Sequence, residues 1–251
     1  MRIQIKDSKK FIEWCELFKF IQKMNQHITI LFKTDEMYIQ IMDGAHVCLI
    51  DINIPKKWFE LYENDENITI GVVSNVLVKI FGMYTKDSLF ELELNDEKDK
   101  LAIHFYNSTQ NKHFEIPLMD IDQDTLSPVI MDTMLDFNIK SSSFDKYINE
   151  LIQFGEDVMI RCENDKLFFE TKNEEGQLQI ELEGDTLEYF NVVENYHFTA
   201  KYPIKYLSII SKFSTNYPYV HLFLDESNPV RITFDNSEIH VNYFLAPKME
   251  D

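Results

Sequence analysis

One pattern recurs four times along the chain, and it limits the possible folds more than any other feature. A segment with apolar residues spaced three and four apart, typical of a helix, is followed by two or three segments in which apolar and polar residues alternate, typical of strands. The helical segments cover about residues 8–24, 73–82, 142–153 and 202–213. Their starts lie roughly 60–70 residues apart, a period that predicts an internal repeat.

The first helical segment and the hairpins indicate how each repeat buries a core. One face of the first helix collects Phe11, Trp14, Cys15, Phe18 and Ile21. The alternating segments include "LFELELNDEKDKLAIHFYN", "VMIRCENDKLFFETKN" and "VHLFLDESNPVRITFDN", each with Asn, Asp, Glu or Pro at its turn, as hairpins prefer. We therefore expect an α+β chain whose helices pack on antiparallel sheets.

The four repeats group into two halves, which we place at residues 1–117 and 135–251. The segment between them, 118–134, has the sequence "LMDIDQDTLSPVIMDTM" and follows neither the helical nor the strand period. It is acidic, yet it carries apolar side chains such as Leu126 and Val129. Two interpretations remain, a solvated linker and an extended strap that is partly docked.

Charge is distributed unevenly along the chain. The net charge is −19 and the pI about 4.7, a total that would argue against a nucleic-acid partner because phosphate contacts need Lys and Arg. The four helical segments, however, hold eight lysines and four acidic residues, which leaves +4 on the helices and −23 on the rest. If the four helices line one surface, that surface is positive and the opposite one negative. Ordinary surface lysines are the alternative.

Several classes of protein are disfavoured. The start "MRIQIKDSKKF" has no apolar core of a signal peptide, and no stretch approaches the roughly 20 apolar residues of a spanning helix, so we expect no secretory leader and no membrane contact. The three cysteines, Cys15, Cys48 and Cys162, are far apart and odd in number, which fits a reducing compartment.

Motifs for catalysis or ligand binding are absent from the sequence. It has no GxxxxGK[ST], GxGxxG or GxSxG, and six glycines leave little for a phosphate loop. The seven histidines show none of the close spacings with cysteine or histidine that structural metal sites use. We therefore expect no enzyme, no catalytic residue, no cofactor and no metal.

The stretch "NYFLAPKMED" at the end of the given sequence raises a separate question. Tyr243, Phe244 and Leu245 are large and apolar within a few residues of the last one, where a terminus is normally polar and frayed. Either they fill the core of the chain itself, or they form half of a site for something else.

Three stretches together resemble one family. "IMDGAHVCLIDI" (41–52), "LMDIDQDTL" (118–126) and "YFLAPKMED" (243–251) are similar, in this order and at the expected separations, to the signatures of the sliding clamp PCNA, the proliferating cell nuclear antigen. "FDKYINELIQFGEDVMI" (144–160) resembles the third helix of that family. The resemblance extends over essentially the whole chain. It implies the DNA-clamp fold, with an N-terminal clamp domain at 1–117, an interdomain connector at 118–134 and a C-terminal clamp domain at 135–251.

The resemblance also implies a function. Members of the family are head-to-tail homotrimers whose twelve helices line a hole around double-stranded DNA, with the sheets outside. They act as processivity factors for DNA polymerase in replication and repair, and they dock the clamp loader, flap endonuclease, DNA ligase and other proteins that carry a PIP box. We expect the same partners here, and a place in the nucleus, or at the intracellular site of DNA replication if the chain is viral.

The resemblance assigns two sets of site residues. It places the groove for partner peptides on the 41–52 loop, the connector, a strand and the tail. Of the two interpretations of the apolar tail, it therefore favours a wall of a binding groove over filling of the core. The groove residues are Met42, His46, Val47, Leu49, Leu126, Val129, Pro229, Phe244, Leu245, Ala246 and Pro247. The DNA-facing residues are Lys10, Lys19, Lys23, Lys79, Lys146, Lys205 and Lys212. For each apolar groove residue, simple core packing is the alternative.

The sequence departs from the family at several positions. Asn149 and Gln153 stand where arginine and histidine are usual, and Gly82 stands where a lysine is usual, so the lining is less positive than in typical members. Asn164 replaces a lysine that often accepts ubiquitin, although Lys166 is close. Three other functions stay open: a PCNA-like subunit of a heterotrimeric checkpoint clamp, a monomeric viral-type processivity factor, and a scaffold that recruits proteins without binding DNA.

Overall fold

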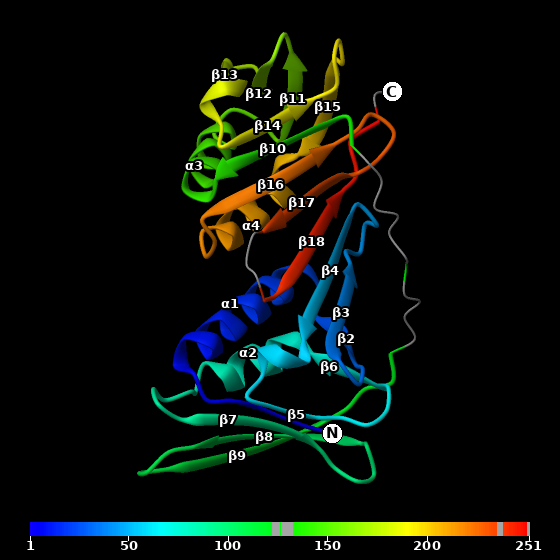
Figure 1. Ribbon diagram of the computed structural model, residues 1–251, viewed down its shortest axis with the longest axis vertical. Coiled ribbons are helices and arrows are strands. Elements are labelled where there is room, and N and C mark those ends of the chain that lie inside the picture. The colour runs from blue at the N-terminus through cyan, green and yellow to red at the C-terminus, as the bar shows by residue number, and fades with distance from the viewer. Residues whose placement is uncertain (122–125, 127–132, 235–237, 250–251) are drawn as a thin grey trace. The chain divides into compact units, whose positions relative to one another are not determined.

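A computed structural model describes residues 1–121, 126, 133–234 and 238–249 (Figure 1). The chain divides into two compact units, each described here by itself. The N-terminal unit contains Met1–Gly44, Ile50–Leu126 and Ser237–Ile239, and the C-terminal unit contains Ala45–Leu49, Ser127–Asn236 and His240–Asp251. No helix in the described part of the chain is long and apolar enough to cross a membrane.

The N-terminal unit places two helices on antiparallel strands (Figure 1). One sheet has the order β5–β1–β7–β8–β9, and β4, β3, β2 and β6 lie side by side in that order. Most of β4 belongs to this unit. The elements are β1 (Arg2–Ile5), α1 (Ser8–Met24), β2 (His27–Phe32), β3 (Glu36–Met42), β4 (Cys48–Pro55), the short 3-10 helix η1 (Lys56–Trp58), β5 (Leu61–Glu63), β6 (Ile68–Val73), α2 (Ser74–Phe81), β7 (Leu89–Leu94), β8 (Lys100–Tyr106) and β9 (Asn111–Pro117).

The C-terminal unit repeats this order of helices and strands. It contains a sheet β13–β12–β11–β15, and the strands β14, β10, β16, β17 and β18 lie side by side in that order. The elements are β10 (Leu135–Lys140), α3 (Ser141–Leu151), β11 (Asp157–Glu163), β12 (Lys166–Lys172), β13 (Gln177–Glu183), the 3-10 helix η2 (Gly184–Thr186), β14 (Tyr189–Val192), β15 (Phe198–Pro203), α4 (Ile204–Ser214), β16 (Tyr219–Leu224), β17 (Val230–Phe234) and β18 (His240–Leu245). The predicted internal repeat and the α+β class are therefore confirmed.

The predicted helices and hairpins are confirmed with small shifts of their ends. The four segments expected to be helical form the four α-helices of the described residues, and each predicted end differs from the observed one by at most two residues. The three quoted hairpins form β7–β8, β11–β12 and β16–β17. Asn164 and Asp165, between β11 and β12, both have positive φ, which gives the two-residue turn the twist that hairpins need.

An aromatic cluster fills the core of the N-terminal unit. The fully buried Trp14 of α1 contacts the rings of Phe18, Trp58, Phe81 and Phe90. These residues come from both helices, from η1 and from β7, so a single side chain joins four elements. Burial of a large apolar side chain stabilises a fold by roughly 1.5–3 kcal/mol, and this cluster therefore fixes the helices on the sheets.

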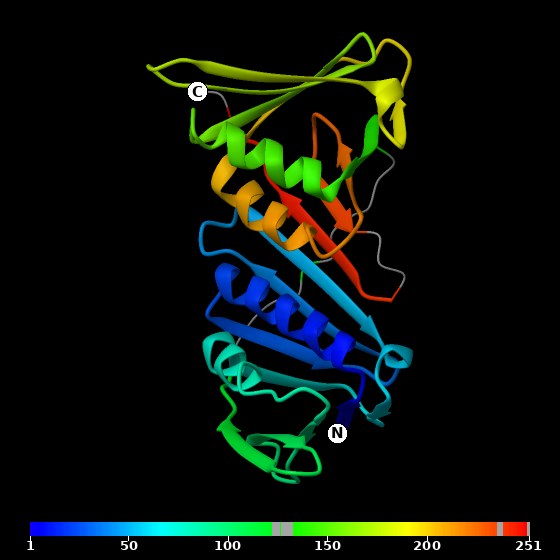
Figure 2. The ribbon, with the colours of Figure 1, turned by 90° about the vertical axis from the view of Figure 1, so that its left-hand side faces the viewer.

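The core of the C-terminal unit likewise includes one face of each of its helices. Phe144, Ile148 and Leu151 of α3 are completely buried, and so is Leu207 of α4. The two helices lie side by side (Figure 2), and the Ser211 hydroxyl on α4 donates to Oδ1 of Asp145 on α3 at 2.9 Å. Each unit thus presents the remaining polar faces of a pair of adjacent helices.

Candidate functional site

The helix pair of the N-terminal unit carries four of the lysines predicted to face DNA. Lys23 on α1 and Lys79 on α2 are exposed, and the salt bridges of the described residues involve neither of them. Lys19 is also exposed, but its Nζ lies 2.7 Å from Glu16 Oε1. Lys10 is directed into its own unit instead, because its Nζ donates to the carbonyl of Trp58 at 2.6 Å.

The helix pair of the C-terminal unit carries the other three. Lys146, Lys205 and Lys212 are all exposed. The Nζ of Lys146 lies 3.8 Å from Glu150 one turn later, and that of Lys205 lies 4.7 Å from the centre of the Tyr206 ring. Exposed pairs of this kind contribute little to stability, so these ammonium groups remain available to an external anion.

The tail of the C-terminal unit is held by backbone hydrogen bonds. The N–H of Ala246 donates to the carbonyl of Val47 at 2.9 Å, and that of Lys248 donates to the carbonyl of Lys201 at 2.7 Å. The Lys248 ammonium adds an ion pair with Asp157, 2.6 Å from Oδ1. These contacts hold the tail on this unit as far as Lys248.

A cleft of about 700 Å³ lies beside this tail. Three predicted groove residues line it, namely Val47, Ala246 and Pro247, and their side chains are half-buried. Lys205, predicted to face DNA, lines it as well. The remaining wall was not predicted and comes from Ala45, Ile152, Gly155, Glu156, Asp157, Pro203, Ile204, Tyr206 and Lys248. No period in the sequence joins these four stretches, so only the fold brings them together.

Strand β18 divides the apolar residues that precede the tail between two faces. Tyr243 and Leu245 have no exposed surface, and the Tyr243 hydroxyl donates to the carbonyl of Tyr206 on α4 at 3.1 Å. Phe244 points to the opposite face and is 9% exposed. Leu245 is therefore packed in the core of its own unit, as in the alternative that the sequence had left open, and its part in a groove wall stays a prediction.

The other predicted groove residues of the C-terminal unit have different environments. His46 is exposed with φ of 56°, a left-handed conformation that suits the turn before β4. Leu49 is only 9% exposed. Pro229 was expected within a strand, but it lies in the turn just before β17, where its missing N–H costs no ladder hydrogen bond.

The connector begins as a docked strand-like segment on the N-terminal unit. The N–H of Met119 donates to the carbonyl of Gly71 on β6 at 2.9 Å. Further on, the Gln40 side chain of β3 bonds both the N–H and the carbonyl of Leu126, at 2.7 and 2.8 Å. Leu126 is nevertheless 47% exposed, and Met42 at the end of β3 is half-buried. Val129 lies outside the described residues, so its predicted role stays a prediction.

The departures from the family signatures also have structural settings. Gly82 follows α2 as its C-terminal cap, with its N–H bonded to the carbonyl of Val78 at 3.0 Å. Asn149 and Gln153 are exposed at the end of α3. Lys166 bridges Glu181 and Glu183 on the neighbouring strand, 2.6 and 2.8 Å away.

Comparison with known proteins assigns the family. Residues 13–126 match the family model of the proliferating cell nuclear antigen, N-terminal domain, and residues 131–249 match that of its C-terminal domain. The chain belongs to the proliferating cell nuclear antigen family of DNA sliding clamps. The predicted family and DNA-clamp fold are thus confirmed.

Individual relatives agree with this assignment. The chain is 28% identical over 229 residues to a DNA polymerase sliding clamp of Methanococcus vannielii, covering 88% of this chain and 90% of the relative. It is 24% identical over 216 residues to proliferating cell nuclear antigen 2 of Drosophila melanogaster, covering 85% of each. A crystal structure of a PCNA2–PCNA3 complex from Sulfolobus tokodaii shares the fold, with a TM-score of 0.86, 20% identity and full coverage of both chains.

Proposed function

We propose that this protein is a DNA sliding clamp that closes into a homotrimeric ring around double-stranded DNA. The observation that carries the proposal is the repeated placement of exposed lysines on the helix pair of each unit, in a chain whose net charge is −19. A basic helical face attracts the phosphate backbone without reading sequence, while acidic sheets repel it. A processivity factor needs this combination, because it must hold DNA and still slide.

The cleft beside the tail supports a second role as a docking platform. Its half-buried apolar residues Val47, Ala246 and Pro247 suit a short amphipathic turn of a partner, the helix-in-groove mode of recognition. DNA polymerase, the clamp loader, flap endonuclease, DNA ligase and other PIP-box proteins are the partners that we propose. The nucleus, or an intracellular viral replication site, is the corresponding location. The predicted domain limits 1–117, 118–134 and 135–251 remain part of this proposal.

A mixed ring is the second candidate. The solved structure with the same fold is described as a complex of two different chains, PCNA2 and PCNA3. In that case this chain by itself would not form a trimer, and a different clamp subunit would complete the ring. Light scattering of the pure protein separates the two candidates.

Charge removal on the helices tests the proposal. The triple variant Lys79→Ala, Lys146→Ala, Lys212→Ala should reduce processivity of a cognate polymerase, loaded by its loader on primed circular DNA. Each lost phosphate contact should lower the log–log salt slope of DNA association by about 0.9. The control removes three lysines outside the four α-helices, Lys57, Lys100 and Lys172, and should leave both readouts near those of the wild type. Equal processivity of the triple variant and the wild type over a range of salt would contradict the proposal.

A further inference from the structure

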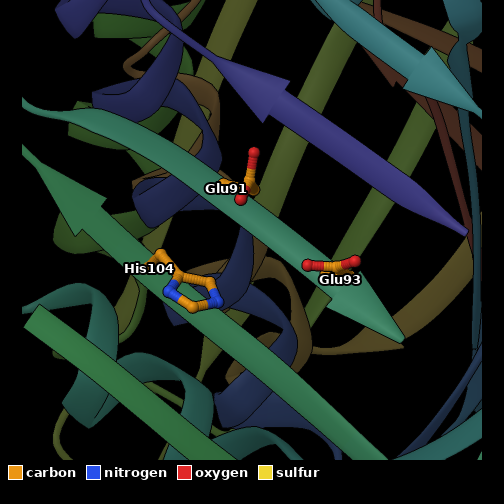
Figure 3. Close-up of side chains that lie close together, drawn as sticks. All are labelled: Glu91, Glu93 and His104. Carbon is orange, nitrogen blue, oxygen red and sulfur yellow. The ribbon is translucent and has the colours of Figure 1, made fainter. Parts of the chain in front are cut away.

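The outer face of the β1–β7–β8–β9 sheet gathers groups that neither DNA nor partner peptides require. Glu91 on β7 lies directly opposite His104 on β8, and His104 lies directly opposite His113 on β9. Glu93 follows Glu91 by two residues and so projects from the same face. Figure 3 shows Glu91, Glu93 and His104 close together, and one ligand atom from each lies within 4.8 Å of the others.

The surroundings hold His104 in an orientation suited to binding. Its Nδ1 lies 3.0 Å from Nδ1 of His113, so Nε2 is the nitrogen that remains for the glutamates. The His113 ring is itself oriented, because its Nε2 lies 3.5 Å from Oε1 of Glu115. Metal-binding histidines characteristically use their second nitrogen in this way, which fixes the tautomer.

The two glutamates differ in how firmly they are held. Oε2 of Glu91 accepts from Arg2 at 2.8 Å and from Gln4, while Oε1 accepts, among the described residues, from Tyr106 alone, at 3.0 Å. A carboxylate oxygen has two lone pairs, so Oε1 retains one for a cation. Glu93 is exposed, and its carboxylate makes no hydrogen bond to the residues that the structure describes. It is therefore free to move the distance of about 1–2 Å that would bring ligand atoms to the roughly 3.4 Å spacing of a tetrahedral ion.

We propose that Glu91, Glu93 and His104 form a binding site for a divalent first-row transition-metal ion, with His113 as a positioning residue. One imidazole and two carboxylates favour borderline ions such as Zn²⁺ over Mg²⁺ or Ca²⁺, which prefer oxygen ligands alone. Arg2 offsets only one of the two carboxylate charges, so the site retains a net negative charge that attracts a dication. All of these residues belong to the N-terminal unit, and the proposal does not rest on ring formation.

The spacing of residues in the sequence did not predict this site. The expectation of no metal rested on close spacings of histidine and cysteine, whereas these ligands come from two adjacent strands and are separated by a hairpin turn. Cross-strand register, rather than sequence spacing, places their side chains together.

Calorimetric titration of the full chain with ZnCl₂ and with MgCl₂ near pH 7 tests the proposal. Zn²⁺ should saturate one site per chain and bind at least tenfold more tightly than Mg²⁺. Glu93→Gln and His104→Gln should each weaken Zn²⁺ binding at least tenfold. His113→Gln should weaken it by about 10–100-fold, the usual effect of losing an outer-shell partner. Co²⁺ used as a probe should show visible absorption bands in the wild type that these variants lose.

Two controls distinguish loss of this site from nonspecific Zn²⁺ binding and from misfolding. His27→Gln removes an exposed histidine elsewhere in the N-terminal unit and should leave Zn²⁺ affinity unchanged. Glu93 is exposed, so Glu93→Gln should melt within a few degrees of the wild type even if a histidine variant folds poorly. Wild-type Zn²⁺ affinity in Glu93→Gln, equal loss in His27→Gln, or equal affinity for Mg²⁺ would each overturn the proposal.

Discussion

At the scale of single residues, Asp51 on β4 lies in surroundings that disfavour the charged form of its carboxylate. Its Oδ1 is buried and has no hydrogen-bond partner among the described residues. Burial, with the nearby Glu36 charge, raises the pKa of Asp51 above 3.8, and this outweighs the opposing effects of the Tyr38 hydroxyl and Lys33. The folded state therefore binds a proton more readily than the unfolded chain does.

The sign of the pH dependence follows from this shift. Since the folded pKa is the higher one, the contribution of Asp51 to stability is present below pH 3.8 and is lost as the pH rises through the folded pKa. Asp51→Asn should therefore gain stability over the wild type as the pH rises through the folded pKa of Asp51. Thermal melts from pH 3 to pH 7 measure this difference. The exposed Asp65→Asn is the control, and a difference that shrinks with rising pH would contradict the assignment.

Gly71 illustrates a residue chosen for space. A Cβ at this position would collide with the carbonyl oxygen of Met119 and come within 2.7 Å of the Ile121 side chain. Only glycine lets the start of the connector approach β6 this closely. The docked strap, rather than the solvated linker, therefore describes this part of the connector.

Gly71→Ala should release the start of the connector. We expect a loss of about 1–3 kcal/mol in the free energy of unfolding, the usual cost of overpacking. Hydrogen exchange of the Met119 amide should become faster, because its bond to the Gly71 carbonyl is broken. Gly176→Ala, where a Cβ meets nothing within 4 Å, is the matched control. Unchanged exchange at Met119 in Gly71→Ala would contradict this account.

At the scale of elements, β18 and the tail combine two tasks in one continuous stretch. Within the strand, alternation assigns Leu245 to the core and Phe244 to the outer face. Beyond the strand, Ala246 and Pro247 are half-buried beside the cleft. Neighbouring residues of similar apolar character therefore differ in role: Leu245 stabilises the core, and Ala246 and Pro247 belong to the proposed peptide groove.

A pair of variants separates the two tasks. Leu245→Ala should lower the free energy of unfolding by about 2–5 kcal/mol, as for other buried leucines, and leave peptide affinity nearly unchanged. Pro247→Glu should leave the melting temperature within a few degrees and weaken a peptide with a Gln-x-x-aliphatic-x-x-aromatic-aromatic pattern at least tenfold, about 1.4 kcal/mol. Calorimetry and thermal melts provide the two readouts. If Pro247→Glu bound the peptide as tightly as the wild type does, the cleft would not be part of the peptide groove.

At the scale of the whole molecule, each unit ends one sheet in an edge strand that has a partner strand on one side only among the described residues. β9 is an edge of the sheet of the N-terminal unit, and β13 is an edge of a sheet of the C-terminal unit. Each places apolar side chains on one face, such as Phe114 on β9 and Ile180 on β13, both half-buried. Exposed edges with an apolar face invite pairing with another chain.

We expect β9 of one copy to pair with β13 of the next, which would close the proposed trimer. Ile180→Pro removes one backbone donor from β13 and should convert trimers into monomers at micromolar concentration, as measured by light scattering. Glu63→Pro, on β5 at the opposite edge of the β9 sheet, should leave the trimer intact. Circular dichroism verifies that both variants fold. A trimer that survives Ile180→Pro would refute this pairing, and a monomeric wild type would favour the mixed ring.

The sequence by itself determined the helices, the hairpins, the twofold repeat and the family. Helical and strand periods are local properties, because they follow from which side chains face the same side within a few residues. For this reason the face of α1 around Phe11, Trp14 and Phe18 was predicted and found buried. The helical period likewise predicted that Lys79 and Lys212 lie on the polar faces of their helices, and both side chains are exposed.

Only the tertiary structure decided which residues from distant stretches meet. The inward turn of Lys10 toward Trp58, the burial of Leu245 and the cleft that joins Val47 to Ala246 all depend on contacts between elements far apart in sequence. The approach of His104 to Glu91 depends on strand register in the same way. Such contacts are set by packing of the whole unit, since a shift of one residue in register would turn these side chains to the opposite face.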